Sequence, residues 1–390
     1  MRLLRLAEYQ SRAFPPLNRR TAEMLAATGA VRVAADLDGR TVLTASSRVG
    51  ILRCGDIQLR ITPKFPVRRL LWLLGYAHNP RGWREDDIID LAETDDFVTA
   101  LAMSFYAATR RALTRGVLQG YHAIEETLPV LKGRLREVDQ IRRRGGLALP
   151  VEVRYDDYTI DIPENRILLT AALRLLRIPG LPAATCRGIR TLAALLTGVT
   201  PLPVGDAVPC PPPNRMNDRY QGALRLARIV LAGHGIDHAP GTASAVGFLF
   251  DLDTVFEQWL TAVLRHSLPA DLGRLRDQPV YHLDTDERVR IRPDLVWERH
   301  GRPNAVLDAK YKHTTHSNAP HADLYQMLAY CTALRLDEGH LVYASGTGPS
   351  THTIPGGGTR IHLWALDLAL PRRELLADIH ALAVRITNAQ

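Results

Sequence analysis

Lysine is scarce in this chain of 390 residues. The 49 basic residues include only four lysines, and all the others are arginines. Two of the four, Lys310 and Lys312, fall within the pentapeptide Asp-Ala-Lys-Tyr-Lys (residues 308–312). Arginine is a planar fork that stays protonated, whereas the lysine ammonium is compact and has a pKa that its surroundings can tune. We therefore expect that residues 308–312 need the ammonium group itself.

Other common sequence features are also rare or missing. The four cysteines form no Cys-x-x-Cys pair, which argues against a zinc ribbon or a disulfide framework and favours a reducing compartment. No apolar run approaches the length that crosses a bilayer, and the amino terminus lacks the features of a signal peptide. No Gly-x-x-x-x-Gly-Lys-Ser/Thr motif is present, so the chain offers no P-loop. We expect a cytoplasmic protein with no membrane partner.

Composition points to a globular protein of more than one domain. Hydrophobic residues make up 46% of the chain and charged residues 23%, which provides ample material for a core. A length of 390 residues exceeds the size at which single cores stop growing, about 250–300 residues. The formal net charge of +8 gives mild support for an acidic partner such as nucleic acid.

The order of patterns predicts a mixed α/β protein in three regions. Residues 1–120 form a strand-rich N-terminal domain, because residues 31–65 alternate in polarity and are broken by turn-forming Asp-Gly, Val-Gly and Cys-Gly-Asp steps. Residues 121–240 are mixed but mainly helical, and they end near a proline-rich linker at residues 205–215. Residues 241–390 form an α/β domain.

The C-terminal region alternates helices and strands. Apolar residues recur with a helical period over residues 251–268, which predicts an amphipathic helix. Three strands follow, then a helix, two more strands and a final helix. The predicted ranges are strands at 279–283, 289–298, 304–312, 340–345 and 360–368, and helices at 319–336 and 371–388. A central sheet flanked by helices is the expected solution.

Two carboxylates and one ammonium are predicted to converge on this sheet. Asp308 and Lys310 are two residues apart in one strand, so their side chains share a face. If the preceding strand is a neighbour, Asp294 can face both of them. Hard oxygen ligands of this kind bind Mg²⁺, for which Mn²⁺ can substitute. A metal of this type activates water and neutralises phosphate charge, and Lys310 could orient the water or stabilise the transition state.

The Pro-Asp step followed by Asp-Ala-Lys resembles the PD-(D/E)xK nuclease superfamily. The resemblance implies a restriction-endonuclease-like α/β core in which those three residues are catalytic and the two aspartates bind metal. Members often add an acidic metal ligand from the preceding helix. Glu257 is the best match for this catalytic and metal-binding position, although Asp251 and Asp253 are nearby competitors.

A second part of the same resemblance lies on the helix after the lysines. Gln326 and Tyr330 match the Gln-x-x-x-Tyr pattern that some superfamily members carry near the active site and DNA. The resemblance therefore implies DNA-binding roles for these two residues. We expect Lys312 to contact DNA as well.

Across its length the chain is similar to the McrC family, the nuclease subunits of McrBC-type modification-dependent restriction systems. The similar stretches include residues 49–65, 131–135 and 155–171, together with the C-terminal motifs. The resemblance implies that the N-terminal region docks on a hexameric AAA+ NTPase, McrB, and stimulates its GTP hydrolysis. That partner would recognise modified double-stranded DNA of the 5-methylcytosine type and translocate it, which fits a chain that has no P-loop.

Three functions remain open at this level. The leading one is a Mg²⁺-dependent DNA endonuclease subunit of a restriction complex. The second is a non-catalytic activator or scaffold of the NTPase, against which the intact acidic pair and lysine argue. The third is a stand-alone RecB-like repair nuclease, against which the long non-nuclease half argues.

Lys64 and a cluster of acidic residues lie outside the motifs described above. Lys64 has no evident role. The acidic residues at 156–164 are expected to cap the helix that follows rather than to form a second metal site.

Overall fold

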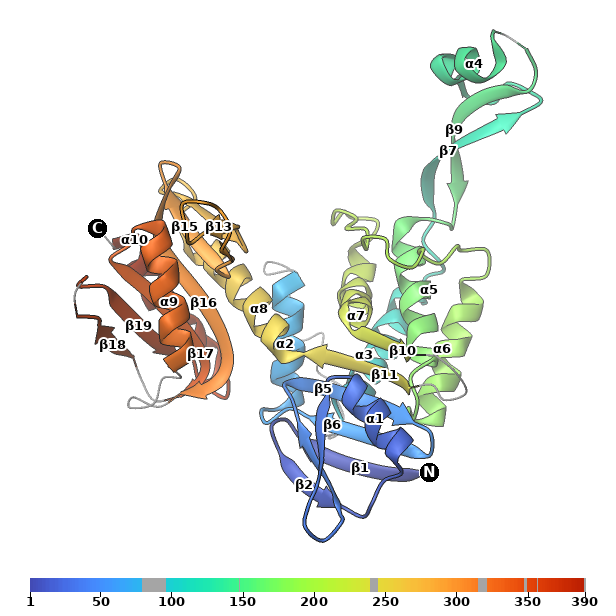
Figure 1. The fold of residues 1–390 in the computed structure, drawn as a ribbon. Helices are drawn as coiled ribbons and strands as arrows, with labels where there is room; N and C mark the ends of the chain where they lie inside the picture. Colours follow the sequence, from blue (N-terminus) through green and yellow to red (C-terminus); the bar gives the residue numbers. More distant parts are fainter. Residues whose placement is uncertain are drawn as a thin grey trace. The chain divides into compact units, whose positions relative to one another are not determined.

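The structure, a computed structural model, is a mixed α/β protein, which confirms the predicted class (Figure 1). It describes residues 1–78, 96–146, 148–238, 245–314, 321–346, 349–355 and 357–388. The chain divides into two compact units. The first combines Met1–Ala100 with Gly233–Gln390, and the second is Leu101–Ala232. Among the described helices, none is both long and apolar enough to cross a membrane.

A five-stranded sheet forms the N-terminal part of the first unit. Its strands, in spatial order, are β1 (Arg2–Ala7), β6 (Ile57–Thr62), β5 (Arg48–Cys54), β11 (Ala245–Asp251) and β10 (His234–His238). The predicted hairpin is β5–β6, whose Cys-Gly-Asp turn places Gly55 at a φ of +60°. The parallel pairing of β1 with β6 brings the start of the chain beside this hairpin.

Strand β11 pairs with β5, although the whole second unit separates these two strands in the sequence. The first unit is therefore made of two separate stretches of the chain. Gly50 has a φ of +140°, and a Cβ at this position would collide with the Phe248 carbonyl oxygen, so the close approach of the two strands requires glycine. The sequence predicted region boundaries at residues 120 and 240, whereas the two compact units are divided after Ala100 and after Ala232. A strand that follows the middle region completes the N-terminal sheet, and such long-range pairing leaves no local mark in the sequence.

A smaller sheet and two helices complete the N-terminal part. The sheet runs in the order β2 (Ser11–Phe14), β4 (Thr41–Ala45) and β3 (Val31–Ala35). The helices are α1 (Arg19–Ala27) and α2 (Val67–His78). The Asn18 side chain caps α1 by accepting a hydrogen bond from the Thr21 N–H at 2.8 Å. The strand-rich N-terminal region that the sequence predicts is therefore present.

The C-terminal part of the first unit is built on a six-stranded mixed sheet. Its strands, in spatial order, are β12 (Arg274–Asp277), β15 (Leu295–Arg299), β16 (Arg302–Thr314), β17 (Glu338–Gly346), β19 (Arg360–Ala365) and β18 (Ser350–Thr353). Strands β15 and β16 are antiparallel, whereas β16, β17 and β19 are parallel neighbours. A short antiparallel pair, β13 (Tyr281–His282) and β14 (Arg290–Ile291), precedes β15 in the sequence.

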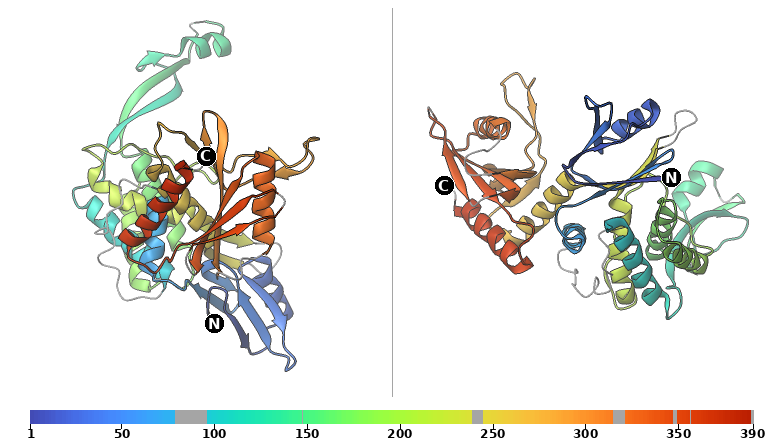
Figure 2. Two further views of the ribbon diagram at one scale, coloured as in Figure 1. Left: turned by 90° about the vertical axis from the view of Figure 1, so that its left-hand side faces the viewer. Right: turned by 90° about the horizontal axis from the view of Figure 1, so that it is seen from below.

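Helices cover both faces of this sheet (Figure 2). Helix α9 (His321–Leu334) packs on one face, so closely that a Cβ at Gly339 would overlap Met327 and Cys331. Helices α8 (Leu252–Ser267) and α10 (Arg372–Asn388) pack together on the other face. The predicted helical stripe of α8 is buried, and it includes Trp259 and Leu260 at 0% exposure.

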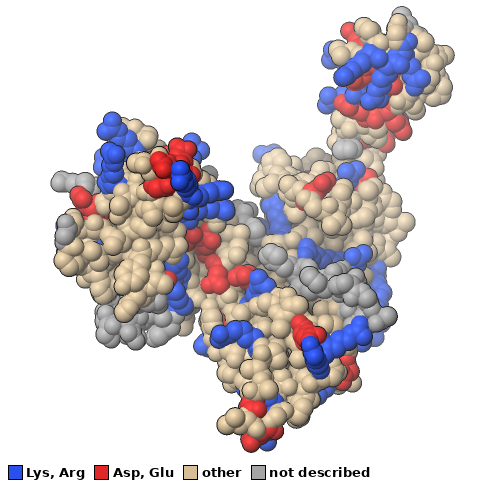
Figure 3. Space-filling view, in the orientation of Figure 1, with Lys and Arg blue, Asp and Glu red and all other residues tan. Residues whose placement is uncertain are grey.

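The second unit consists of helices and an extended hairpin arm. Helix α3 (Phe97–Leu113) leads into it, followed by the arm strands β7 (Gly120–Leu128), β8 (Arg134–Leu135) and β9 (Val151–Thr159) with α4 (Glu137–Arg144). The remaining helices are α5 (Pro163–Leu176), α6 (Ala183–Leu195), the 3-10 turn η2 (Asp218–Tyr220) and α7 (Gln221–Ala232). Three consecutive arginines, Arg142, Arg143 and Arg144, occupy the last turn of α4, and Figure 3 shows Lys and Arg side chains gathered at this end of the arm.

The acidic residues before α5 have structural partners. Arg166 donates two hydrogen bonds to Asp161, at 2.7 and 2.8 Å, and Thr200 adds two more. Although burial opposes it, this set of donors holds the pKa of Asp161 at about 2. Glu164, in the first turn of α5, accepts a hydrogen bond from Asn217 at 3.0 Å. Both residues are thus tied to neighbouring side chains of the same unit.

A histidine in the core of the C-terminal sheet makes stability depend on pH. His340 on β17 has 0% exposure and stacks on His362, with ring centroids 5.2 Å apart. Burial, together with the charge of His362, lowers the pKa of His340 from 6.5 to about 3. The unfolded chain therefore binds a proton at a higher pH than the folded chain does.

We expect acid to destabilise the fold through His340. Its contribution should be complete above about pH 6.5 and should fall by at most about 1.4 kcal/mol per pH unit as the pH drops toward 3. Chemical unfolding of the parent and of His340→Gln between pH 7 and 4.5 tests this. The variant should show a flatter dependence on pH, whereas substitution of the exposed His380 should leave it unchanged. Parallel curves for parent and His340→Gln would contradict the assignment.

Candidate functional site

Asp294, Asp308 and Lys310 come together where β15 and β16 lie side by side. The two strands pair antiparallel with Leu295 opposite Leu307, as the sequence predicts for neighbouring strands. Asp294 immediately precedes β15 instead of lying within it. Its Oδ2 accepts a hydrogen bond of 2.8 Å from the Ala309 N–H, which fixes the carboxylate against β16.

Lys310 is the counter-ion of Asp308. The Lys310 Nζ forms an ion pair with Asp308 Oδ2, and it donates a hydrogen bond of 3.0 Å to Gln326 on α9. The Asp308 side chain is 2% exposed and that of Lys310 is 20% exposed. Burial alone would lower the pKa of Lys310, but the negative charge of Asp308 outweighs this effect and the pKa is raised. The ammonium is therefore charged and held in place from both sides.

Glu257 on α8 is the acidic residue of this helix whose negative charge interacts with those of Asp294 and Asp308. Burial raises the pKa of Glu257, a hydrogen bond from Gln278 at 2.5 Å opposes the rise, and the negative charge of Asp308 adds to it. The competitors have other roles. Asp251 caps α8 and pairs with Arg48 at 3.3 Å, whereas Asp253 is held by the Ser47 hydroxyl.

The three carboxylates repel one another. The pKa of Asp294 is raised to about 8, first by burial and then by the negative charges of Asp308 and Glu257. A carboxyl group whose ionisation is disfavoured by like charges is typical of sites that hold a cation. One ammonium, that of Lys310, lies against this group.

The donor chemistry of the site fits a divalent metal. Carboxylate oxygens are the ligands that Mg²⁺ and Mn²⁺ prefer, and the mutual repulsion around Asp294 would be relieved by a cation. In the part of the chain that the structure describes, no three acidic, histidine or cysteine side chains already surround a point where a metal could sit. Metal binding by Asp294, Asp308 and Glu257 therefore stays a prediction.

Helix α9 contributes both predicted residues to the surroundings of the lysine. The Gln326 Nε2 donates a hydrogen bond of 2.7 Å to the Tyr330 hydroxyl, which in turn donates to the Arg292 carbonyl at 3.2 Å. Because the Gln326 oxygen accepts from Lys310, the Gln-x-x-x-Tyr pair links α9 to β16 and to the segment before Asp294. Their contact with DNA stays a prediction.

Lys312 has a partner that the sequence did not reveal. It forms an ion pair of 2.8 Å with Asp323 on α9, and Asp323 also accepts a hydrogen bond of 2.9 Å from the Tyr343 hydroxyl. Asp323 is 5% exposed. An aspartate in the first turn of a helix is an ordinary sequence feature, so only its place opposite the lysines in space identifies it.

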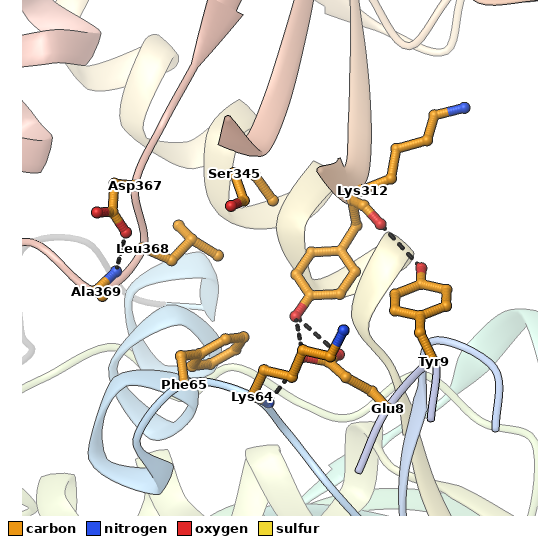
Figure 4. A pocket seen from close by; sticks show the side chains of 11 residues that line it. Glu8, Tyr9, Lys64, Phe65, Lys312, Ser345, Asp367, Leu368 and Ala369 are labelled. Atoms are coloured by element: carbon orange, nitrogen blue, oxygen red, sulfur yellow. Dashed lines mark hydrogen bonds between the residues drawn. The ribbon is translucent and has the colours of Figure 1, made fainter. Parts of the chain in front are cut away.

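A cavity of about 610 Å³ lies beside the far end of β16 (Figure 4). Its lining comes from both parts of the first unit and is mostly aromatic or aliphatic. The residues are Glu8, Tyr9, Lys64, Phe65, Tyr311, Lys312, Ala344, Ser345, Asp367, Leu368 and Ala369. Lys64, which had no assignment from sequence, donates its backbone N–H to Glu8 at 2.8 Å and places its ammonium over the Tyr9 ring.

The solved structures that are similar to this chain include two complexes. A chain of the refined half-complex from the tetradecameric assembly of Thermococcus gammatolerans McrB AAA+ hexamers with bound McrC is 16% identical, with 98% of this chain and 100% of that chain covered and a TM-score of 0.62. A chain of the Thermococcus gammatolerans McrBC complex is also 16% identical, with 70% of this chain and 89% of that chain covered and a TM-score of 0.43. At this identity, the first likeness shows a shared fold.

The sequence itself places the chain in a family. No curated protein matches it. The family model described as McrBC 5-methylcytosine restriction system component matches residues 43–344, which is most of the chain. The match begins within β4 and extends beyond Lys310, so it covers the whole second unit and the three residues Asp294, Asp308 and Lys310. The resemblance noted in the sequence is thereby confirmed: the chain belongs to the family of McrBC 5-methylcytosine restriction system components.

Proposed function

We propose that this chain is the DNA endonuclease subunit of a 5-methylcytosine-type restriction complex in the cytoplasm, with Mg²⁺ as cofactor. The observation that carries the proposal is the convergence of Asp308 and Lys310 on β16 with Asp294 immediately before the neighbouring strand β15, with Glu257 close enough to affect the aspartates electrostatically. Family membership supports a role in restriction. The reaction would be hydrolysis of a phosphodiester bond in double-stranded DNA.

The proposed roles follow from the chemistry of each group. Asp294, Asp308 and Glu257 would hold the metal, which supplies an activated water and neutralises phosphate charge. Lys310, kept protonated beside Asp308, would stabilise the negative charge that develops on the phosphate. Gln326 holds the Lys310 ammonium from the opposite side, so the charge is positioned before DNA arrives.

The proposed partner is a hexameric AAA+ GTPase. A chain in a complex of McrB AAA+ hexamers with bound McrC shares this fold, and this sequence has no P-loop with which to drive translocation itself. In the proposal the partner recognises the modified base and moves the DNA. This chain docks on it, stimulates its GTPase and cuts, with Gln326, Tyr330 and Lys312 contacting the DNA.

Two observations favour a second function, a non-catalytic activator of the NTPase. The Lys310 ammonium forms an ion pair with the Asp308 carboxylate, which is a proposed metal ligand. Among the described residues, no three candidate ligands are already arranged so that they could hold a metal ion. A decayed nuclease fold that only stimulates its partner would also have these features. The two functions differ in whether complex-dependent DNA cutting requires Asp308.

We expect Asp308→Ala to abolish DNA cleavage by the complex. Loss of a preorganised charged group from such a site lowers rates by about 10²–10³-fold. The variant should also bind Mn²⁺ more weakly, as measured by electron paramagnetic resonance without any DNA. Asp251→Asn is the matched control, because asparagine can keep the cap of α8. Cleavage by Asp308→Ala at the parent rate would assign the chemistry elsewhere.

Lys310→Arg tests why lysine is kept here. Arginine preserves the positive charge, but its wider fork does not fit the position of a compact ammonium between Asp308 and Gln326. We expect almost no cleavage, together with partner binding at the parent affinity. A plasmid-nicking assay measures the first and size-exclusion chromatography the second. Robust nicking by this variant would show that charge alone is sufficient.

We expect the purified chain to cut DNA weakly or not at all with Mg²⁺ or Mn²⁺. Addition of its AAA+ partner, nucleotide and modified DNA should restore cutting, because the motor is supplied from outside. Gel electrophoresis of linear DNA after each incubation measures both arms. Vigorous cleavage of unmodified DNA by the chain alone would instead identify a stand-alone nuclease. Complex-dependent cutting that survives in Asp308→Ala would support the non-catalytic activator.

A further inference from the structure

Two residues of the N-terminal part contact β16 from the face opposite Asp308 and Lys310. The Tyr311 hydroxyl donates to both carboxylate oxygens of Glu8, at 2.9 and 3.0 Å. The Tyr9 hydroxyl donates to the backbone carbonyl of Tyr311 at 2.9 Å. Figure 4 shows Tyr9 and Glu8 beside the cavity, which Tyr311 also lines. Tyr311 directly follows Lys310, so these contacts hold the backbone of the proposed catalytic strand.

The Glu8 contact is buried and specific. Glu8 is 2% exposed, and burial raises its pKa. Besides Tyr311, the Lys64 N–H donates to its carboxylate at 2.8 Å. A buried carboxylate is costly unless it is hydrogen-bonded, so Tyr311 and Glu8 each fix the position of the other. On its other side Tyr311 contacts the Phe256 ring of α8, with centroids 6.2 Å apart.

The Tyr9 hydroxyl contacts β16 where its pairing with β17 is irregular. The register between β16 and β17 is regular from Val306 to Lys310 and then shifts before His313. The Tyr311 carbonyl lies in this irregular stretch, where a strand loses regular partners. The hydrogen bond from Tyr9 therefore holds β16 at the point where its own sheet holds it less regularly, immediately after Lys310.

The backbone at Tyr9 is strained. Its φ of +56° lies in the left-handed region, which is unfavourable for a bulky side chain. Strain of this kind persists where the surrounding contacts fix the conformation. Here the contacts are the hydroxyl bond to Tyr311 and the Lys64 ammonium, which lies 5.6 Å from the centroid of the Tyr9 ring.

The ring contacts of Tyr311 with Tyr9 and Phe65 leave space unfilled on this side. The cavity of about 610 Å³ is lined by Tyr311 and Ala344 from the C-terminal sheet and by Phe65 from the N-terminal part. Empty volume allows side chains to shift at little steric cost. The directional hydrogen bonds from Tyr311 to Glu8 and from Tyr9 to the Tyr311 carbonyl therefore add to the ring contacts in setting the position of this part of β16.

We propose that Glu8 and Tyr9 are positioning residues that act through Tyr311 to place Lys310 between Asp308 and Gln326. We call the contacts of Glu8 and Tyr9 with Tyr311 the brace. Through the brace, the N-terminal sheet becomes a component of the proposed nuclease centre. Any movement of that sheet would change the alignment of the Lys310 ammonium and hence the cleavage rate. The effect on rate rests on the proposed nuclease function, whereas the effect on the position of Lys310 does not.

The scarcity of lysine gives a direct readout. The chain has four lysines, so side-chain labelling of lysine yields four NMR signals, and that of Lys310 is identified by its loss in Lys310→Arg. We expect Tyr9→Phe and Glu8→Ala each to shift the Lys310 signal at constant pH. Each should slow single-turnover cleavage by the assembled complex at saturating DNA by about tenfold or more, the scale expected for misplacement of a catalytic group. DNA affinity should not change.

Two further variants separate positioning from a general loss of stability. Glu8→Gln keeps an oxygen that accepts from Tyr311 and from the Lys64 N–H, so it should retain the parent signal and rate. Tyr220→Phe removes a buried acceptor of the Leu118 N–H in the other unit, and it should leave the Lys310 signal unchanged. A brace that acts by hydrogen bonding is excluded if Glu8→Gln is as defective as Glu8→Ala.

The possible failures can be told apart. If the Lys310 signal is the same in the parent, Tyr9→Phe and Glu8→Ala, the brace does not exist, even if Asp308-dependent cleavage is intact. If the signal shifts in both variants but the parent complex cuts no DNA, the brace stands and the nuclease function is wrong. A shift in Tyr220→Phe as large as in Tyr9→Phe would mean that stability alone moves Lys310, which would also overturn the brace.

Discussion

The ion pair between Asp308 and Lys310 is the interaction on which the rest of the candidate site depends. An ionised carboxylate with 2% exposure costs several kcal/mol to bury unless a partner compensates it. Lys310 supplies this compensation from two residues further along the same strand. Each neighbouring element then adds one group: the turn before β15 adds Asp294, α8 adds Glu257, and α9 adds Gln326. The sheet sets these distances because β15 and β16 are paired in a fixed register.

Charge balance accounts for the lysine at this site and is the basis for the proposed metal. Asp294, Asp308 and Glu257 place three acids near one ammonium, and burial together with the charges of the other two acids raises the pKa of Asp294 to about 8. A second cation would restore the balance, and hard divalent ions suit carboxylates. Arginine at position 310 would bring the same charge in a larger, planar group. A compact ammonium leaves more space beside Asp308 for metal and phosphate.

The sequence predicted the parts of the site whose signal is local. Asp308 and Lys310 share a strand face because they are two residues apart, and the apolar period of α8 was sufficient to place Glu257 on a helix. The pairing of β11 with β5 could not be predicted, since a whole second unit separates the two strands in sequence. Glu8 was missed for the same reason: its partner Tyr311 lies about 300 residues away, and a glutamate at the end of a strand looks like any exposed charge.

The discontinuous first unit gives the N-terminal sheet two attachments to the candidate site. Strand β11 ends at Asp251, which caps α8 and pairs with Arg48 of β5, so the sheet fixes the start of the helix that carries Glu257. The contact of Glu8 with Tyr311 fixes β16 one residue after Lys310. These attachments reach two different candidate groups through two different elements. A rigid shift of the sheet would therefore move the Glu257 carboxylate and the Lys310 ammonium together. The N-terminal sheet thus supports the acidic group and its counter-ion at once, and a fragment that consists of residues 252–390 alone would lack both supports.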